Sequence, residues 1–304
     1  MTTLHRSKNS TLRSTFGVLF LLCLFCLCGT LCAQLTPPFA NDPLAVIRGC
    51  PFCGVGLVVW YKVLPHYRAG LIWPSLLGTN HAAISPAAAG WTSTKRPGGY
   101  GEMGFDGASS YVHSGQNAGI TYNAPFTICV WYHSESTTGI ASLVTTSTIN
   151  TYTGLTLNAG QNNAYPDFTL GNQTGSAYLQ IGSTGSLATS VWHHLCGVYD
   201  GSQVIGGLSM YAEGVPLSTY VVTNTGSGAF NDNPLSVGAE TNNVSHLLGG
   251  MDDVMLWRRA LSAQEILAVY RSTSTVEPFE GDQLAVAGLP TPPSTSPRRR
   301  VTIE

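Results

Sequence analysis

The sequence brings chemically capable side chains together at two places. Cys50-Pro-Phe-Cys53 is a C-x-x-C motif, and His193 and His194 are adjacent. A structural zinc site takes four ligands, and no second C-x-x-C lies outside the apolar run 16–33. A thioredoxin-like role requires a βαβ context that the flanking sequence does not predict. Neighbours on a strand point to opposite faces, so the two histidines cannot chelate one ion. We expect Cys50 and Cys53 to form a local disulfide or to stay as thiols, and the histidines to be structural.

Missing motifs and charge exclude several functions. The chain has no G-x-S-x-G turn, no H-E-x-x-H motif and no lysine preceded by glycine, which removes the phosphate-binding loop. Charged residues make up only 10% of the chain. Residues 99–275 contain three Arg and no Lys against six Asp and five Glu. Such an acidic body repels phosphate backbones, so we expect no nucleic-acid partner and favour neutral ligands or divalent cations.

Residues 1–33 have the pattern of an export signal. A positively charged start precedes the apolar run Phe16–Ala33, and Ala33 is a suitable last residue before cleavage. The run is also just long enough for a membrane anchor, so membrane contact is expected only through residues 16–33 if they are retained. We expect the protein to be secreted or to stand on a cell surface, with a virion surface as an alternative. Four of the eight cysteines lie in this run.

The rest of the chain predicts an all-β body. Short apolar runs alternate with Gly, Asn, Ser and Thr clusters, a rhythm typical of sandwiches and barrels. The expected strands are 56–63, 102–105, 111–113, 126–133, 140–146, 154–157, 167–171, 178–181, 192–199, 208–212, 215–222, 235–238 and 253–258. One helix is expected over 261–270, because Ser262 and Glu265 form a capping box; it should lie like a lid at the edge of the sandwich. Residues 34–55 are interpreted as a linker and residues 276–304 as a disordered tail.

Three ordered segments carry a family resemblance. The first is Met103–Val112 (MGFDGASSYV) followed by Phe126–Trp131 (FTICVW), and the second is Trp192–Gly201 (WHHLCGVYDG) running on to Leu208–Gly214 (LSMYAEG). The third is Gly250–Ser262 (GMDDVMLWRRALS). In order and spacing they resemble the laminin G-like jelly rolls of the concanavalin A-like lectin/glucanase superfamily. The resemblance implies a two-sheet antiparallel jelly-roll sandwich over residues 56–275, closed by one short C-terminal capping helix. It is specific for the fold and says little about function.

The resemblance also bears on catalysis. Enzymes of this superfamily hydrolyse β-glucans with an E-x-D-x-x-E strand, whose carboxylates serve as acid and nucleophile. This chain lacks that strand, and its nearest acidic cluster, Glu277, Glu280 and Asp282, lies in the expected tail. We therefore expect a protein that is not an enzyme.

Calcium is the one cofactor that the resemblance implies. Related jelly rolls often hold Ca²⁺ with Asp and backbone oxygens, which are the hard ligands that calcium takes. Asp106 and Asp252 lie in matching motifs, on strands that this fold tends to bring together. The alternative is that both carboxylates cap turn amides or pair with Arg258 or Arg259.

Two cysteines depart from the family pattern. Cys129 and Cys196 stand where relatives usually carry a small residue. If their strands are neighbours, the sulfurs should be in contact, and they should form a disulfide if the protein meets an oxidising compartment. The alternative is a pair of buried thiols acting as small apolar groups.

The leading functional hypothesis is a non-catalytic extracellular module that binds a glycan or another surface polymer. Aromatic faces stack on sugar C–H surfaces, and amides hydrogen bond to sugar hydroxyls. The candidate ligand-binding residues are Trp91, Tyr100, Tyr132, Tyr165, Tyr178, Asn162, Asn163 and Asn172. The alternative is a structural or adhesive protein of a cell envelope or virion that uses the jelly roll to contact a protein partner.

Overall fold

The computed structural model describes residues 53–274, apart from eleven short gaps. The gaps are 65–70, 78–79, 86–89, 93–95, 137–138, 148–152, 162–164, 173–176, 227–229, 231–232 and 241–243. The expected export segment, the tail, Cys50 and most of the linker lie outside the described residues. The pairing of Cys50 with Cys53 and the ends of the domain therefore stay predictions.

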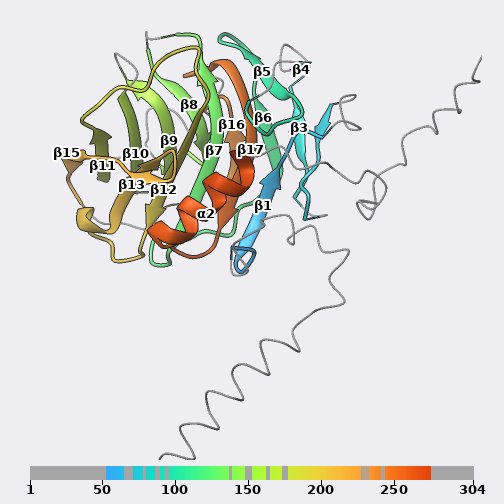
Figure 1. Cartoon of the computed structure of the whole chain (residues 1–304). Helices are drawn as coiled ribbons and strands as arrows, with labels where there is room; N and C mark the ends of the chain where they lie inside the picture. Colours follow the sequence, from blue (N-terminus) through green and yellow to red (C-terminus); the bar gives the residue numbers. More distant parts are fainter. Residues whose placement is uncertain are drawn as a thin grey trace, which may run out of the picture. The chain divides into compact units, whose positions relative to one another are not determined.

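The described strands form two antiparallel sheets, which we name sheet A and sheet B (Figure 1). The strands of sheet A, in spatial order, are β14 (Val215–Pro216), β13 (Leu208–Ala212), β12 (His193–Tyr199), β7 (Phe126–Ser134), β17 (Leu248–Trp257), β5 (Glu102–Asp106) and β4 (Gly90–Thr92). Strand β1 (Leu57–Tyr61) also pairs with β17. The strands of sheet B are β15 (Thr219–Asn224), β11 (Tyr178–Ser183), β10 (Tyr165–Gly171), β9 (Gly154–Gln161), β8 (Ala141–Thr145), β16 (Pro234–Val237), β6 (Val112–Asn117), β3 (Ala82–Ile84) and β2 (Ile72–Trp73). The predicted jelly-roll sandwich is confirmed.

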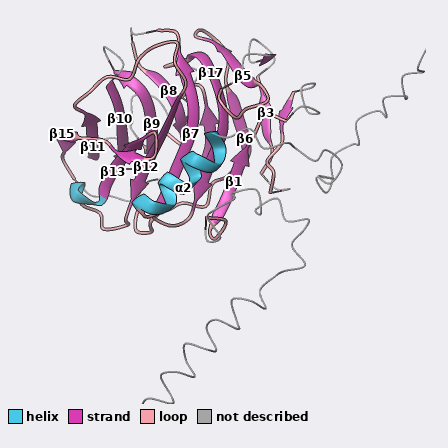
Figure 2. Ribbon diagram, in the orientation of Figure 1, coloured by secondary structure: helices cyan, strands magenta, loops and turns pink. Residues whose placement is uncertain are grey.

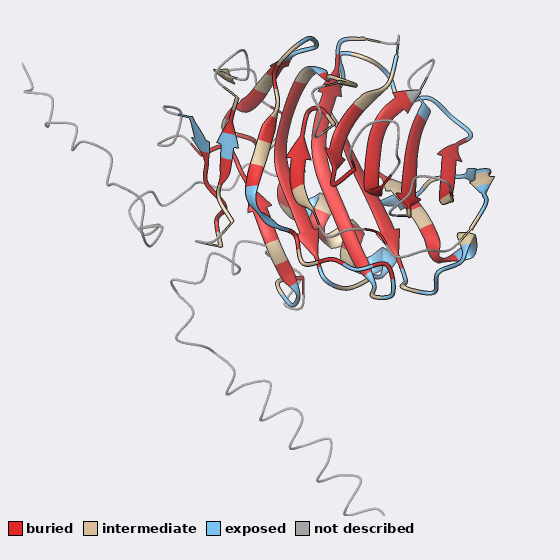
Figure 3. Ribbon diagram, turned by 180° about the vertical axis from the view of Figure 1, so that it is seen from behind, coloured by how far each residue is buried: buried red, intermediate tan, exposed pale blue. Residues whose placement is uncertain are grey.

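The hydrophobic core lies between the two sheets, because alternate side chains of each strand point inward. In β7 the inward residues are Phe126, Ile128 and Val130, all fully buried. From sheet B, the ring of Phe168 meets Phe126 edge to face. A Cβ on Gly197 of β12 would lie only 3.0 Å from the Phe168 ring, so this glycine lets the sheets approach closely. Buried residues follow the strands in Figure 3.

One predicted strand is wrong in extent. Residues 215–222 were expected to form a single strand, but they divide into β14 in sheet A and β15 in sheet B. Pro216 cannot donate a backbone hydrogen bond, and the Leu217 amide donates to the Met210 carbonyl of β13 at 2.9 Å before the chain crosses to the other sheet. The loop-rich stretch before Gly99 also contains the short strands β2, β3 and β4, and a 3₁₀ turn (Ile205–Gly207) precedes β13.

The helix α2 (Ala263–Ser274) covers the outer face of sheet A, rather than the edge where we expected it (Figure 2). Its capping box forms as predicted: the Ser262 amide donates to Glu265 Oε2 at 2.8 Å, and the Glu265 amide donates to Ser262 Oγ at 3.3 Å. The ring of Tyr270 stacks on Trp131 of β7 with centroids 5.6 Å apart. The indole of Trp131 donates to Thr273 Oγ1 at 2.8 Å. Sheet A is therefore buried on both faces in its centre.

A β-bulge in β17 turns two consecutive carboxylates toward the helix. Asp252 pairs with Trp131 and Met255 pairs with Cys129, so β17 has one residue more than β7 over this stretch. Asp253 takes a left-handed backbone with φ of 47°. In a regular strand Asp252 and Asp253 would point to opposite faces; the bulge lets both reach the same cation.

That cation is Arg96, which is 1% exposed. Its Nε donates to Asp252 Oδ2 at 3.0 Å, and its Nη2 donates to Asp253 Oδ2. Lys62 adds a second cation, with Nζ 3.0 Å from Asp253 Oδ2. Burial alone would raise the pKa of Asp253, but the two cations outweigh it and lower that pKa. Arg96 also donates to the carbonyl of Thr273, so the network joins sheet A to the end of α2.

We predict that Arg96→Leu lowers the free energy of unfolding by about 3–5 kcal/mol, because it leaves two buried carboxylates with Lys62 alone. Arg259→Leu is the matched control. Arg259 forms a partly exposed ion pair with Glu265 at 2.8 Å, and its loss should cost less than about 1 kcal/mol. Urea denaturation of both variants measures the difference; equal losses would contradict the structural role of Arg96.

Candidate functional site

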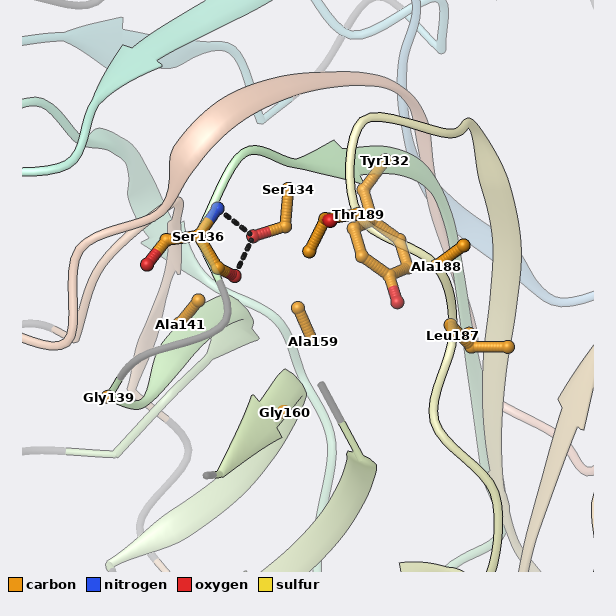
Figure 4. Close-up of a pocket in the computed structure, with 10 residues that line it drawn as sticks. All are labelled: Tyr132, Ser134, Ser136, Gly139, Ala141, Ala159, Gly160, Leu187, Ala188 and Thr189. Atoms are coloured by element: carbon orange, nitrogen blue, oxygen red, sulfur yellow. Dashed lines mark hydrogen bonds between the residues drawn. The ribbon is translucent and has the colours of Figure 1, made fainter. Parts of the chain in front are cut away.

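A hollow opens at the end of the sandwich where β7, β9 and β11 end and β8, β10 and β12 begin; we name this end the rim. The hollow encloses about 310 Å³, open solvent included. Its lining residues are Tyr132, Ser134, Ser136, Gly139, Ala141, Ala159, Gly160, Leu187, Ala188 and Thr189 (Figure 4). Small and hydroxyl-bearing side chains therefore surround a single aromatic ring.

Tyr132 is the central residue of the hollow. The alternation of β7 points it inward after Phe126, Ile128 and Val130, and its side chain is 2% exposed. In Figure 4 its hydroxyl points into the space between Ala159 and Leu187. Burial raises the pKa of this phenol, and the charge of Glu213 adds to the effect. Within the described part of the chain the hydroxyl has no hydrogen-bond partner, so it is available to a ligand or a water.

Residues 184–192 form one wall of the hollow and are held at two points. The amide of Ser190 donates to the Ser134 carbonyl at 2.8 Å, and its hydroxyl donates to Glu135 Oε2 at 2.5 Å. At the second point, Nε2 of His193 lies 3.0 Å from the Ala188 carbonyl. Ser190 itself has a left-handed φ of 58°. The wall is thus fixed to the ends of β7 and β12.

His133 supports the first of these points. Its Nε2 lies 2.8 Å from Glu102 Oε2, and its Nδ1 lies 2.8 Å from Glu135 Oε1. Burial alone would lower the pKa of His133, but the two carboxylates outweigh it and raise that pKa. A protonated ring donates from both nitrogens, so His133 links β5 to the residue that holds Ser190.

A second polar cluster lies on the outer face of sheet B. Asp167 is 4% exposed and accepts hydrogen bonds from Asn158 Nδ2 at 3.0 Å, Gln180 Nε2 at 3.2 Å and Thr169 Oγ1 at 3.3 Å. Burial raises the pKa of Asp167 to about 6, although these three donors oppose the shift. The residues of this cluster are not among the predicted site residues. Its signal is the alternation of polar residues with the inward Leu157, Phe168 and Ile181 in β9, β10 and β11.

The structure does not gather the predicted ligand-binding residues into one site. Tyr132 and Tyr165 lie at the rim, and Asn162 and Asn163, between β9 and β10, lie outside the described residues. Asn172 and Tyr178 flank the β10–β11 turn at the opposite end of the sandwich. Trp91 belongs to β4, where its ring meets Trp73 edge to face, and Tyr100 precedes β5. The set is therefore divided among three places.

The two predicted calcium ligands also lie apart. Asp106 pairs with Leu248, and Asp252 lies four residues further along β17, roughly 13 Å away. Calcium ligands lie 2.3–2.6 Å from the ion, so these carboxylates cannot share one. Asp106 accepts hydrogen bonds from the amides of Ala108, Ser109 and Ser110. This is the turn-capping role that was the alternative to calcium binding. Asp252 binds Arg96 instead of the expected arginines, so the residues do not fit a shared calcium site.

The structure joins Cys129 and Cys196 in a disulfide. The two residues are direct partners in the register of β7 and β12. Their side chains lie on the outer face of sheet A beneath α2, opposite the core-facing Ile128 and Leu195.

The sequence matches one known protein family. The model described as "Concanavalin A-like lectin/glucanases superfamily", of the laminin G type, matches residues 106–267, more than half of the chain. The chain belongs to this superfamily. A search of curated protein sequences finds no match.

Solved structures similar to this superfamily member are binding domains. The binding domain of Paraclostridial Mosquitocidal Protein 1 superposes with a TM-score of 0.55 at 13% identity, covering 71% of this chain and 52% of that one. The botulinum neurotoxin serotype D binding domain gives 0.52 at 11%, covering 71% and 51%. The chain spans about half the length of these toxin domains.

A third similar structure is a shorter chain. Domain 4 of AbnA, an extracellular arabinanase from Geobacillus stearothermophilus, was solved with arabinotriose; it gives 0.52 at 13% identity, covering 70% of this chain and 98% of that one. At such identities the likeness concerns the fold. Among the described residues, no helix is both long and apolar enough to cross a membrane.

We predict that His133 makes the folded state less stable as pH rises above 6.5. Its pKa is raised in the folded state, so its contribution is complete below the unfolded value and is lost as pH rises through the folded value. The difference in unfolding free energy between the wild type and His133→Gln should shrink between pH 6 and pH 9. A pH-independent difference would contradict the protonated bridge between Glu102 and Glu135.

We predict that Asp167 also makes the folded state less stable as pH rises, in a lower pH range than His133. Its folded pKa of about 6 exceeds the ordinary value of 3.8, so ionisation destabilises the folded state as pH rises from about 4 to 6. The loss should be on the order of 2–3 kcal/mol. Comparing Asp167→Asn with the wild type by denaturation at pH 4 and pH 7 isolates this slope, and parallel pH curves would refute it.

Proposed function

We propose that the domain is a non-catalytic module that binds a glycan or another surface polymer at the rim hollow. The observation that carries the proposal is the hydroxyl of Tyr132, which has no hydrogen-bond partner among the described residues and opens into the hollow, although the ring behind it is buried. A ligand hydroxyl that enters the hollow could hydrogen bond to this group in place of water. Membership of a lectin superfamily and the similarity to binding domains support the proposal.

The lining of the hollow suits a sugar. The ring of Tyr132 offers an apolar surface, while Ser134, Ser136 and Thr189 add hydroxyls. Glycines, alanines and Leu187 complete the wall, so a sugar hydroxyl can approach the phenol from the open side of the hollow. Glu135 and Glu213 lie close by and would repel sulfated or carboxylated chains. We therefore favour a neutral glycan.

The lining also supports a binding role without catalysis. Glycoside hydrolysis requires two carboxylates that flank the scissile bond. None of the ten residues that line the hollow is an Asp or a Glu. The expected position outside the cell rests on the pattern of residues 1–33 and remains part of the proposal.

A surface protein that contacts other proteins is the second candidate. Strand β15 lies at the edge of sheet B and is exposed on both faces, with Tyr220 53% and Val221 55% exposed. Residues 219–224 include no charge and no proline, the features that usually prevent edge strands from pairing. Co-purification of the protein with a cell-envelope or virion fraction, together with a failure to bind any glycan, would favour this candidate.

We predict that Tyr132→Phe weakens glycan binding about three- to tenfold, the value of one lost hydrogen bond. The same change should leave the stability of the protein nearly equal, because the hydroxyl donates no hydrogen bond to the described residues and the buried ring is kept. The matched control is Tyr178→Phe, at the opposite end of the sandwich, which should bind like the wild type. A glycan array followed by calorimetry measures these effects; no glycan bound by the wild type at millimolar concentration would overturn the proposal.

A further inference from the structure

Three side chains of types that bind metals meet on the outer face of sheet A. None of them lines the rim hollow. Cys129 and Cys196 are cross-strand partners, and His194 precedes Cys196 by two residues on the same face of β12. One ligand atom of each lies within 4.8 Å of the others. Cys196 Sγ is 3.9 Å from both ring nitrogens of His194. All three residues are fully buried.

Two aromatic rings hold the imidazole of His194 beside the sulfurs. The ring lies between Trp131, with centroids 5.3 Å apart, and Tyr270 of α2, with centroids 5.7 Å apart. A neutral imidazole held in this way offers a nitrogen lone pair to a metal ion.

In the oxidised protein the two sulfurs are bonded to each other, so they do not act as thiolate ligands. A dithiol reductant changes this: the S–S bond takes two electrons and two protons, giving two thiols, while the dithiol becomes a cyclic disulfide. We propose that the reduced protein binds one Cu(I) ion through Cys129 Sγ, Cys196 Sγ and a ring nitrogen of His194. Each thiol releases a proton as its thiolate binds the metal.

Coordination number and softness favour Cu(I) over zinc. Thiolates select soft ions, and closed zinc sites take four ligands in a tetrahedron. The cluster supplies three ligands, and the described residues add no further His, Cys, Asp or Glu to it. Cu(I) with two thiolates carries one net negative charge, and Arg96 lies near enough to the cluster to stabilise it.

The disulfide and the metal exclude each other. Oxidation removes both ligand sulfurs at once, so a chain that meets an oxidising compartment loses the site, and a reduced chain keeps it. Because α2 covers the cluster, the ion reaches it when the helix lifts or before the helix docks. The site therefore depends on the redox history of the chain and does not depend on the rim.

The test uses the full chain with the six other cysteines replaced by alanine, so that only one pair of thiols remains. These cysteines are Cys23, Cys26, Cys28, Cys32, Cys50 and Cys53. One preparation stays oxidised and one is reduced with dithiothreitol, then freed of it under nitrogen. Competition with the Cu(I) indicator bicinchoninate measures binding. We expect one Cu(I) per reduced chain and none per oxidised chain; equal copper in both would overturn the proposal.

Two substitutions locate the ligands. His194→Asn in the reduced protein should weaken Cu(I) binding at least tenfold, whereas His193→Asn, which changes the adjacent histidine on the opposite face, should leave it unchanged. Equal effects of the two changes would remove His194 from the site. If His194→Asn fails to fold by circular dichroism, Cys196→Ser serves instead and should abolish binding. Zinc titration of the reduced protein should show weaker binding; tighter zinc binding would overturn the choice of metal.

Discussion

The buried ion network around Arg96 is the interaction on which the rest of the structure depends. The guanidinium binds two consecutive carboxylates, which only a bulge in β17 brings to one face, and it also binds the last turn of α2. Lys62 extends the network to the end of β1. Removing four buried charges from water is costly, so the arrangement holds only while all its partners stay in place. That requirement fixes the position of the helix over sheet A and, with it, the environment of every side chain beneath the helix.

The sequence alone was enough for the fold but not for this network. Strand rhythm, the Ser262–Glu265 capping box and the ordered family motifs depend on local residues, and the structure confirms them. For Asp252 the sequence suggested a calcium ion or, as one alternative, its near neighbours Arg258 or Arg259. The structure uses Arg96, 156 residues away, in a stretch that shows no regular periodicity. No local pattern indicates such a partner, and no alternation reveals a bulge that turns two neighbouring aspartates to one side.

The position of the candidate site could not be predicted from the sequence. The predicted aromatic and amide residues lie on strands and turns at both ends of the sandwich, because antiparallel strands carry their turns to both ends. Tyr132 was one of five aromatic candidates, and its place at the rim follows from the inward alternation of β7, which ends two residues later at Ser134. Asp167 was missed because its hydrogen-bond donors, Asn158 and Gln180, belong to two other strands.

Strand β7 connects the two parts of the molecule to which we assign chemistry. Its inward residues run from the core to Tyr132 at the rim, while its outward residues include Cys129 and Trp131 beneath α2. Strand β12 repeats this division, with Leu195 inward and His194 and Cys196 outward. The inward and outward faces of β7 and β12 share a backbone but no side chain. We therefore expect the rim-facing residues to keep the same neighbours when Cys129 and Cys196 are oxidised or reduced. Alternation within a single pair of strands thus separates the two proposed sites, one on each face of sheet A.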